Sequence, residues 1–225
     1  MRLRFLRPVN GWPGFLTELA IVVLGVLIAL GAQQLAEAAR WRSEVGEFRS
    51  AMDDELAYNL GAYQDRREQS ACIVRRLDQL DAWHRGWQSG QRLRLASPIA
   101  RPLTLNVRSS VWESRTADIA AHLGLERRLN YAYLYDAFAG YQSILVDERR
   151  LWNELLDFEG ADKLGSSDLL RLRGLIERGR IAEKLVRLNW PPIDRRAAAA
   201  GIRARHDDEV AREEAICKPL TWLAV

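Results

Sequence analysis

The residues that most often carry chemistry are few in this 225-residue chain, and they do not gather. The three histidines, His84, His122 and His206, are widely spaced, and none stands at metal-ligand spacing from a cysteine or an acid. The sequence has no glycine-rich phosphate-binding motif and no G-x-S-x-G nucleophile motif. We therefore predict no metal, no cofactor and no catalytic residue. His84 lies on an apolar helical stripe, which indicates a structural histidine.

Three consecutive acidic residues, Asp53, Asp54 and Glu55, are the nearest approach to a general acid and base. Adjacent residues on a helix point in different directions, so we expect these carboxylates not to converge. They do not predict an enzyme.

The most distinctive polar cluster surrounds residue 112. Ser110 and Glu113 fit a capping box that opens a short helix, and this role accounts for both without any function. Trp112 and Arg115 remain, together with Tyr133 on the next predicted helix. These three support an alternative hypothesis, a ligand-binding or sensory helical bundle with a site between its helices.

All of these side chains belong to a chain organised around one apolar stretch, Phe15–Ala36, which carries no charge from Leu19 onward. About 18 to 20 largely apolar residues suffice for a helix to cross the hydrocarbon core of a bilayer. The stretch predicts a transmembrane helix over 15–36, preceded by a tail at 1–14. A helical-bundle domain at 37–219 and a short C-terminal tail at 220–225 follow, so the membrane is the first expected partner.

A cleaved signal peptide is the alternative interpretation of this stretch. Arg2, Arg4 and Arg7 would form its basic region, Leu19–Ala32 its apolar region, and Ala36–Ala38 its cleavage site. The apolar region is long for a signal peptide, and Glu18 directly precedes it, so we favour the membrane anchor.

One face of the predicted membrane helix carries small residues. Gly25, Ala29, Ala32 and Ala36 lie within about 40° of one line on a helical wheel, and Glu18 falls on the same line two turns earlier. Small residues allow a second helix to approach closely in lipid. We predict a homodimer contact through this face. The alternative is a lipid-facing run of small residues without a partner.

The net charge of +3 belongs to the N-terminal tail, where Arg2, Arg4 and Arg7 stand without an acid. The rest of the chain is neutral, which argues against a nucleic-acid partner. Arg-Arg pairs lie among acids on predicted helices and are expected on the solvated surface, at 66–67, 75–76, 127–128, 149–150 and 195–196.

The orientation does not follow from arginine counts, because they are equal on the two sides of the span. Long domains are exported largely regardless of charge. Cys72 and Cys217, the two cysteines, suit one disulfide formed outside the cytosol, with two separate buried thiols as the alternative. We expect a cytoplasmic N-terminus and an exported domain.

Helical periodicity continues after the span, as a stalk to about Gln64 and then as an amphipathic segment to Gly90. Residues 90–109 predict a loop with a short extended piece at Leu103–Val107. A short helix is then expected from Ser110 to Gly124.

The second half of the domain predicts further helices and no sheet. A long helix is expected from about Glu126 to Phe158, and another from Ser167 to Asn189, where Pro191–Pro192 stops it. A short helix around Ala197–Ala200 and an apolar tail that tucks back complete the domain. The buried face of the long helix is predicted to carry Leu134, Phe138, Tyr141, Leu145, Trp152 and Leu155. The predicted class is all-α, a single N-terminal transmembrane helix continuing into a helical bundle.

Several segments resemble a family of uncharacterised proteins of Gram-negative bacteria. They are ELAIVVLGVLIALGAQQ in the span, DELAYNL in the stalk, SSVWES, YAYLYDAF, and a last cysteine before a proline. The resemblance covers most of the chain and implies one N-terminal membrane helix with a helical extracytoplasmic domain. It implies no activity, cofactor or catalytic residue.

The leading hypothesis is a non-enzymatic, single-pass protein of the inner membrane whose domain faces the periplasm. It would act through contacts with an envelope protein, as a scaffold or accessory subunit. The ligand-binding or sensory bundle is the alternative, and an enzyme comes third because converging reactive groups are missing.

Overall fold

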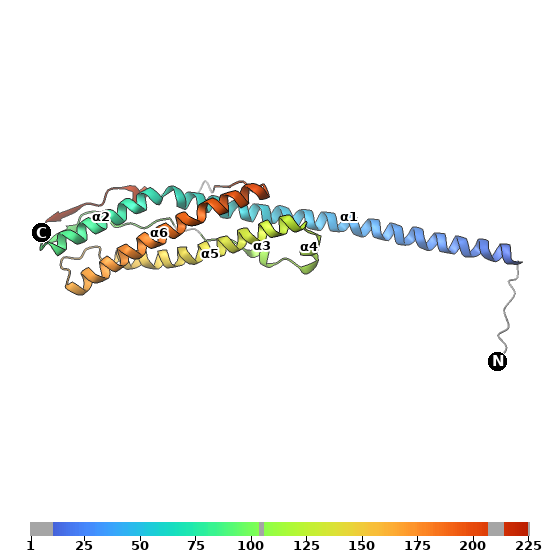
Figure 1. Ribbon diagram of the computed structural model, residues 1–225, viewed down its shortest axis with the longest axis horizontal. Helices are drawn as coiled ribbons and strands as arrows, with labels where there is room; N and C mark the ends of the chain where they lie inside the picture. Colours follow the sequence, from blue (N-terminus) through green and yellow to red (C-terminus); the bar gives the residue numbers. More distant parts are fainter. Residues whose placement is uncertain (1–10, 104–105, 207–213, 225) are drawn as a thin grey trace, which may run out of the picture. The chain divides into compact units, whose positions relative to one another are not determined.

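The computed structural model describes residues 11–103, 106–206 and 214–224, most of which are helical. Its helices are α1 (Gly11–Glu68), α2 (Ser70–Gln88), α3 (Ser110–Glu113), α4 (Ala117–His122), α5 (Leu125–Leu156) and α6 (Ser166–Ala200), with a 3-10 turn η1 (Glu214–Cys217). Figure 1 shows their course. The predicted all-α class is therefore confirmed. Residues 1–10 of the predicted tail, and Val225, lie outside the described residues.

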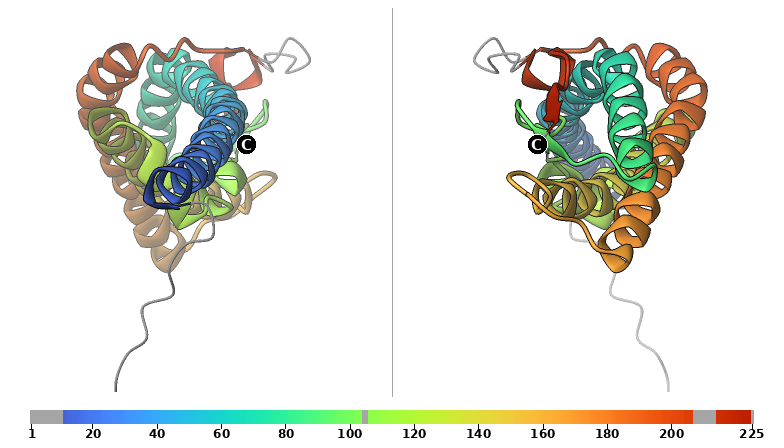
Figure 2. Two further views of the ribbon diagram at one scale, coloured as in Figure 1. Left: turned by 90° about the vertical axis from the view of Figure 1, so that its right-hand side faces the viewer. Right: turned by 90° about the vertical axis from the view of Figure 1, so that its left-hand side faces the viewer.

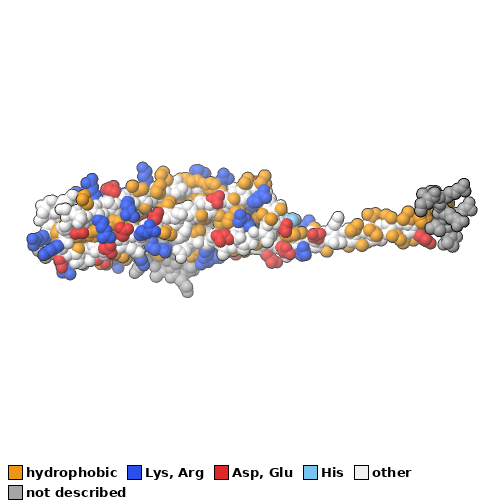
Figure 3. Space-filling model, turned by 90° about the horizontal axis from the view of Figure 1, so that it is seen from below, with side chains coloured by type: hydrophobic (Ala, Val, Ile, Leu, Met, Phe, Trp, Pro, Cys, Tyr) orange, Lys and Arg blue, Asp and Glu red, His pale blue; other side chains and the backbone are white. Residues whose placement is uncertain are grey.

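The chain divides into two units, Met1–Arg49 and Ser50–Val225, and α1 contributes to both. In the first unit the large apolar side chains between Trp12 and Leu35 are exposed, and no part of the most apolar segment of α1 is buried. Hydrophobic side chains cover this part of α1 in Figure 3, whereas acids and bases intermix on the bundle face shown. The unit thus contains the predicted helix that is long and apolar enough to cross a membrane.

The second unit is a bundle in which the later part of α1, α2, α5 and α6 surround one interior (Figure 2). Gln69 separates α1 from α2, and its carbonyl accepts from the amide of Ile73. Large apolar side chains fill the interior, namely Leu77, Leu80 and Trp83 from α2, Leu151, Trp152 and Leu155 from α5, and Leu172, Leu175 and Ile176 from α6. The predicted buried face of α5 is confirmed residue by residue.

A small antiparallel sheet is a feature that sequence periodicity did not predict. Strand β1 (Leu93–Leu95) pairs with β2 (Trp222–Ala224), with Leu93 opposite Ala224 and Leu95 opposite Trp222. The apolar tail therefore folds back onto the domain. The extended piece predicted at Leu103–Val107 is not a strand in its described residues, and 104–105 lie outside them. Strands of three residues are too short for an alternating pattern to be recognised.

Helix α6 runs through Pro191–Pro192, so the predicted stop there is wrong. Each proline lacks an amide hydrogen and leaves one carbonyl of the preceding turn without its helical donor. These carbonyls belong to Arg187 and Leu188, which are exposed and open to hydration. Beyond the prolines Ile193 and Ala197 are 1% and 2% exposed, so their burial favours continuation of the helix.

The helix predicted from Ser110 to Gly124 is two short helices, α3 and α4, separated by residues 114–116. The side chain of Thr116 accepts from the amide of Ile119 and begins α4. Gly124 precedes α5 as its N-cap instead of ending a helix. The competing cap at Thr116 explains the break.

Candidate functional site

The small-residue face of α1 is open along the first unit. Glu18, Gly25, Ala29, Ala32 and Ala36 are all exposed. A Cβ added at Gly25 would meet nothing within 4 Å. The predicted packing face is therefore accessible, and the homodimer contact through it stays a prediction.

A buried ion cluster joins three helices at the centre of the bundle. Arg66 of α1 donates to both carboxylate oxygens of Glu148 on α5, at 2.6 and 3.1 Å, and to Glu183 on α6 at 2.8 Å. The three residues are at most 3% exposed. Arg66 and Arg76 thereby correct the expectation that every Arg-Arg pair lies on the surface, because both are 1% exposed.

Electrostatics within this cluster favour the charged guanidinium. Burial by itself lowers the pKa of Arg66, but the carboxylates of Glu148 and Glu183 outweigh it and raise the pKa above its ordinary value. Burial raises the pKa of Tyr141, which lies beside these groups, and the two carboxylates add to the shift while Arg66 opposes it. Tyr141 therefore stays neutral at physiological pH.

The ion cluster has a structural consequence before any chemical one. Two carboxylates share one guanidinium, so removing the cation would leave both buried without their partner. Its members lie on otherwise apolar stripes of their helices, for example Leu145, Glu148 and Trp152 on α5. A charge in register with an apolar stripe was the sequence signal that could have revealed the cluster.

The adjacent acids Asp53, Asp54 and Glu55 diverge, as the helical geometry predicts. Asp53 accepts from the hydroxyl of Tyr131 at 2.5 Å, and Asp54 is 3.9 Å from Arg205 at the surface. Glu55 turns inward and is 6% exposed. The three carboxylates thus have three different environments and form no acid and base pair.

Glu55, and not Ser110, organises the start of α3. One oxygen of its carboxylate accepts from the Ser110 hydroxyl at 3.0 Å and from the Val111 amide at 3.1 Å. The other accepts from the Tyr135 hydroxyl at 2.8 Å. The predicted capping box is wrong, because Ser110 is the first residue of α3 and its hydroxyl points to Glu55. A carboxylate from another helix replaces the local cap.

The proposed ligand contacts Trp112, Arg115 and Tyr133 make two separate sets of aromatic contacts. Trp112 stacks on Tyr135 with centroids 4.8 Å apart, and the Arg115 guanidinium lies 3.6 Å above the Trp112 ring. Tyr133 instead contacts the guanidinium of Arg196 at 5.0 Å. Trp112 and Arg115 therefore contact each other and Tyr135, whereas Tyr133 contacts Arg196, and a ligand site at these residues stays a prediction.

Cys72 and Cys217 are joined by a disulfide, with Cα atoms 4.7 Å apart. It connects α2 to η1, the turn that precedes β2. Arg76, one turn after Cys72, donates to the carbonyls of Pro98 at 2.8 Å and Ala215 at 3.2 Å. Burial lowers the pKa of Arg76, and Glu159 opposes this shift. The disulfide and the buried guanidinium together attach the C-terminal segment to α2.

His84 is 3% exposed, and its Nε2 lies 3.1 Å from the carbonyl oxygen of Leu169. His206 pairs with Asp65 at 2.8 Å. Within 11–103, 106–206 and 214–224, no three histidine, cysteine, aspartate or glutamate side chains are grouped so that they could hold a metal ion. The position of His84 between α2 and the start of α6 is that of a packed side chain.

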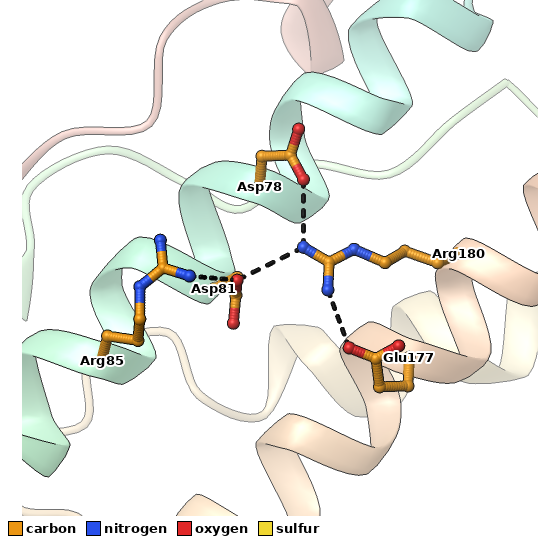
Figure 4. A network of polar contacts seen from close by, with 5 residues as sticks. All are labelled: Asp78, Asp81, Arg85, Glu177 and Arg180. Carbon is orange, nitrogen blue, oxygen red and sulfur yellow. Dashed lines mark hydrogen bonds and ion pairs between the residues drawn. The ribbon is translucent and has the colours of Figure 1, made fainter.

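A second ion network lies on the surface between α2 and α6 (Figure 4). Arg180 of α6 contacts Asp78 at 3.0 Å, Asp81 at 3.3 Å and Glu177 at 2.7 Å. Arg85 contacts the same oxygen of Asp81 at 2.6 Å. Single surface pairs contribute little, but a shared network ties one helix to the other at a defined register.

Two shallow hollows flank α6. One, of about 450 Å³, lies towards α2 and is lined by Val74, Leu77, Arg180, Glu183, Lys184, Arg187 and Leu188. The other, of about 310 Å³, lies towards α5 and is lined by Ile144, Asp147, Glu148, Leu151, Arg178, Ile181, Ala182 and Leu185. Neither includes Trp112, Arg115 or Tyr133.

The chain matches no protein-family model, no curated protein and no solved structure. Its function therefore has to be argued from the geometry of the anchor and the bundle.

Proposed function

We propose that this protein is a single-pass anchor of the bacterial inner membrane whose helical domain faces the periplasm. The domain has no enzymatic role and acts through contacts with another envelope protein, as a scaffold or accessory subunit. The proposal combines an apolar helix, a neutral domain and an interior whose reactive groups serve packing.

The observation that carries the proposal is the uncovered apolar surface of α1. Ile21 is 66% exposed, Leu27 60% and Ile28 64%, and no part of the most apolar segment of α1 is buried. Burying one such side chain contributes about 1.5–3 kcal/mol, so this helix requires an apolar environment that the described chain does not supply. A lipid bilayer is the environment that matches its length.

The periplasmic orientation rests on two supports. The Cys72–Cys217 disulfide fits an oxidising compartment. The span and the SSVWES and YAYLYDAF segments resemble a family of uncharacterised proteins of Gram-negative bacteria, and this resemblance implies the same placement.

The choice of a contact role over catalysis rests on where the titratable groups lie. Glu55 caps α3, Glu148 and Glu183 bind Arg66, and Arg76 holds backbone carbonyls. Each buried charge in this set has a packing partner, whereas a catalytic group needs access to substrate. The surface of the bundle remains the part available for function.

Reporter fusions test the placement. Alkaline phosphatase fused after Val225 is expected to be active, a cytosol-only fluorescent reporter at the same position to be dark, and the protein to remain in the membrane fraction after a carbonate wash. The reversed reporter pattern would overturn the orientation. Recovery in the soluble fraction would overturn the anchor and favour a cleaved signal peptide.

A further inference from the structure

The outer face of α6 carries an apolar ridge formed by Ile181, Leu185 and Leu188. These side chains are 58%, 44% and 63% exposed. Their spacing places them on successive turns of one helical face. Single exposed apolar residues are normal on a protein surface, but a contiguous group on one face marks a site of interaction.

The ridge stands between the two hollows beside α6. Leu188 borders the hollow towards α2, whose floor is apolar at Val74 and Leu77. Ile181 and Leu185 border the hollow towards α5, which reaches down to Leu151. A ridge between two grooves is the shape into which a second helix packs, because its side chains enter both grooves.

The exposed charged residues that line the two hollows are mostly cations. Lys184 and Arg187 line the hollow towards α2, are exposed, and have no ion-pair partner among the described residues. Glu148 and Glu183 also line the hollows, but they are buried and bound to Arg66, so they do not balance these cations at the surface. Asp147 is an exposed acid on the hollow towards α5, but it lies 3.8 Å from Arg150, and the cation Arg178 lines the same hollow.

We propose that the ridge of α6 is the docking surface for one amphipathic helix of a partner protein, apolar on the face that enters the grooves and acidic along its edge. This inference rests on the proposed function and names the chemistry of its partner. Helix-in-groove recognition uses anchors at the same spacings as the ridge, and acidic side chains complement Lys184 and Arg187.

Two other occupants fit less well. A second copy of α6 would bring Lys184 and Arg187 of both chains into one interface, where like charges repel. A lipid surface would satisfy the cations and the ridge, but it presents no side chains to fill the grooves that reach Leu77 and Leu151.

Binding of defined peptides tests the charge and shape of the surface. The full chain in zwitterionic nanodiscs is titrated with a helical peptide that has leucine on one face and glutamate on the other, or with its lysine counterpart. The glutamate peptide is expected to bind and the lysine peptide to fail. The Lys184→Glu, Arg187→Glu double variant should weaken binding of the glutamate peptide about tenfold, because two attractions at the edge of the surface become repulsions.

Leu185→Ser should also weaken binding of the glutamate peptide, whereas Leu170→Ser should leave it unchanged. Leu170 is 71% exposed on the same helix but outside both hollows, which makes it a matched control. Absence of binding, equal binding of both peptides, or equal loss in the two leucine variants would overturn the docking surface.

Photo-crosslinking in intact cells separates this inference from the proposed function. A photoreactive residue is placed at Leu185, at Leu170 or at Leu129, another exposed leucine of the bundle. Adducts at Leu185 with an acidic helical segment of a protein support the docking surface. Protein adducts at Leu129 alone, or adducts of Leu185 with lipid or a second copy, overturn it and leave the contact role intact. No protein adduct at any of these positions counts against the contact role itself.

Discussion

Helix α1 contains two regions with opposite burial on one continuous backbone. From Trp12 to Leu35 its large apolar side chains are exposed, whereas from Met52 to Arg66 its inward face is buried, including the charged residues Glu55 and Arg66. Between Leu19 and Ala32 the first region is apolar on every face, and the second is apolar on one stripe only. The difference teaches that the distribution of apolar residues around a helix, more than their number, indicates what surrounds it.

The two regions also differ in how they treat charge. Glu18 stands exposed beside the apolar run, whereas Arg66 is buried and its Nε and Nη2 donate to two carboxylates. Substitutions along α1 should therefore have large effects on folding in the bundle region and small ones in the apolar region.

The largest effect is expected from Arg66→Ala. This change leaves Glu148 and Glu183 buried without their cation and should lower the free energy of unfolding by about 3–5 kcal/mol. The neighbouring Arg67 is the matched control, since it is 42% exposed in its ion pair with Asp194. Arg67→Ala should cost about 0–1 kcal/mol. Urea unfolding in mild detergent compares them, and equal losses would refute the central role of the cluster.

The disulfide should have the next largest effect. Cys72→Ser with Cys217→Ser is expected to lower the free energy of unfolding by about 2–4 kcal/mol, because the long loop gains freedom in the unfolded chain. Mass spectrometry of the wild-type protein without reductant tests the pairing directly. Two free thiols in protein isolated from the membrane would contradict both the pairing and one support for the orientation.

Glycines on α1 offer a smaller and sharper comparison. A Cβ at Gly61 would lie 2.0 Å from the backbone oxygen of Arg205, whereas one at Gly46 would meet nothing within 4 Å. Gly61→Ala should destabilise the domain by about 1–3 kcal/mol through forced backbone displacement. Gly46→Ala should leave stability unchanged or raise it slightly, since alanine favours the helix. Thermal unfolding followed by circular dichroism distinguishes them, and equal midpoints would show that the close approach at Gly61 relaxes without cost.

The smallest effect is expected in the membrane. If the small-residue face mediates a homodimer, Gly25→Leu should weaken association by about 1 kcal/mol, because the larger side chain prevents close backbone approach. Leu27→Ala, on the opposite face, should not. An in-membrane association assay measures this. Equal signals for the wild type and both variants would show that the small-residue face contacts lipid and no partner helix.

Much of the architecture could be predicted because it depends on local patterns. The apolar stretch predicts a helix long and apolar enough to cross a membrane, and the spacing of Leu134, Phe138, Tyr141 and Leu145 identifies the buried face of α5. The paired cysteines could be proposed, although sequence left their bonding open.

The features that could not be predicted depend on contacts between segments that are distant in sequence. Proline usually breaks a helix. Helix α6 nevertheless continues through Pro191 and Pro192, because burial of Ile193 beyond them favours the helix. Strand β1 exists because the chain end returns to pair with it.

The sequence by itself determined that the chain has one apolar, uncharged helix and a neutral helical domain, because hydropathy and periodicity are local properties of a segment. Only the tertiary structure decided which charges are buried and which surface remains free. Arg66 and Arg67 are adjacent and identical in type, yet one is enclosed by Glu148 and Glu183 while the other pairs at the surface. Burial of a side chain depends on three helices meeting around it, and that meeting is not encoded in any one segment.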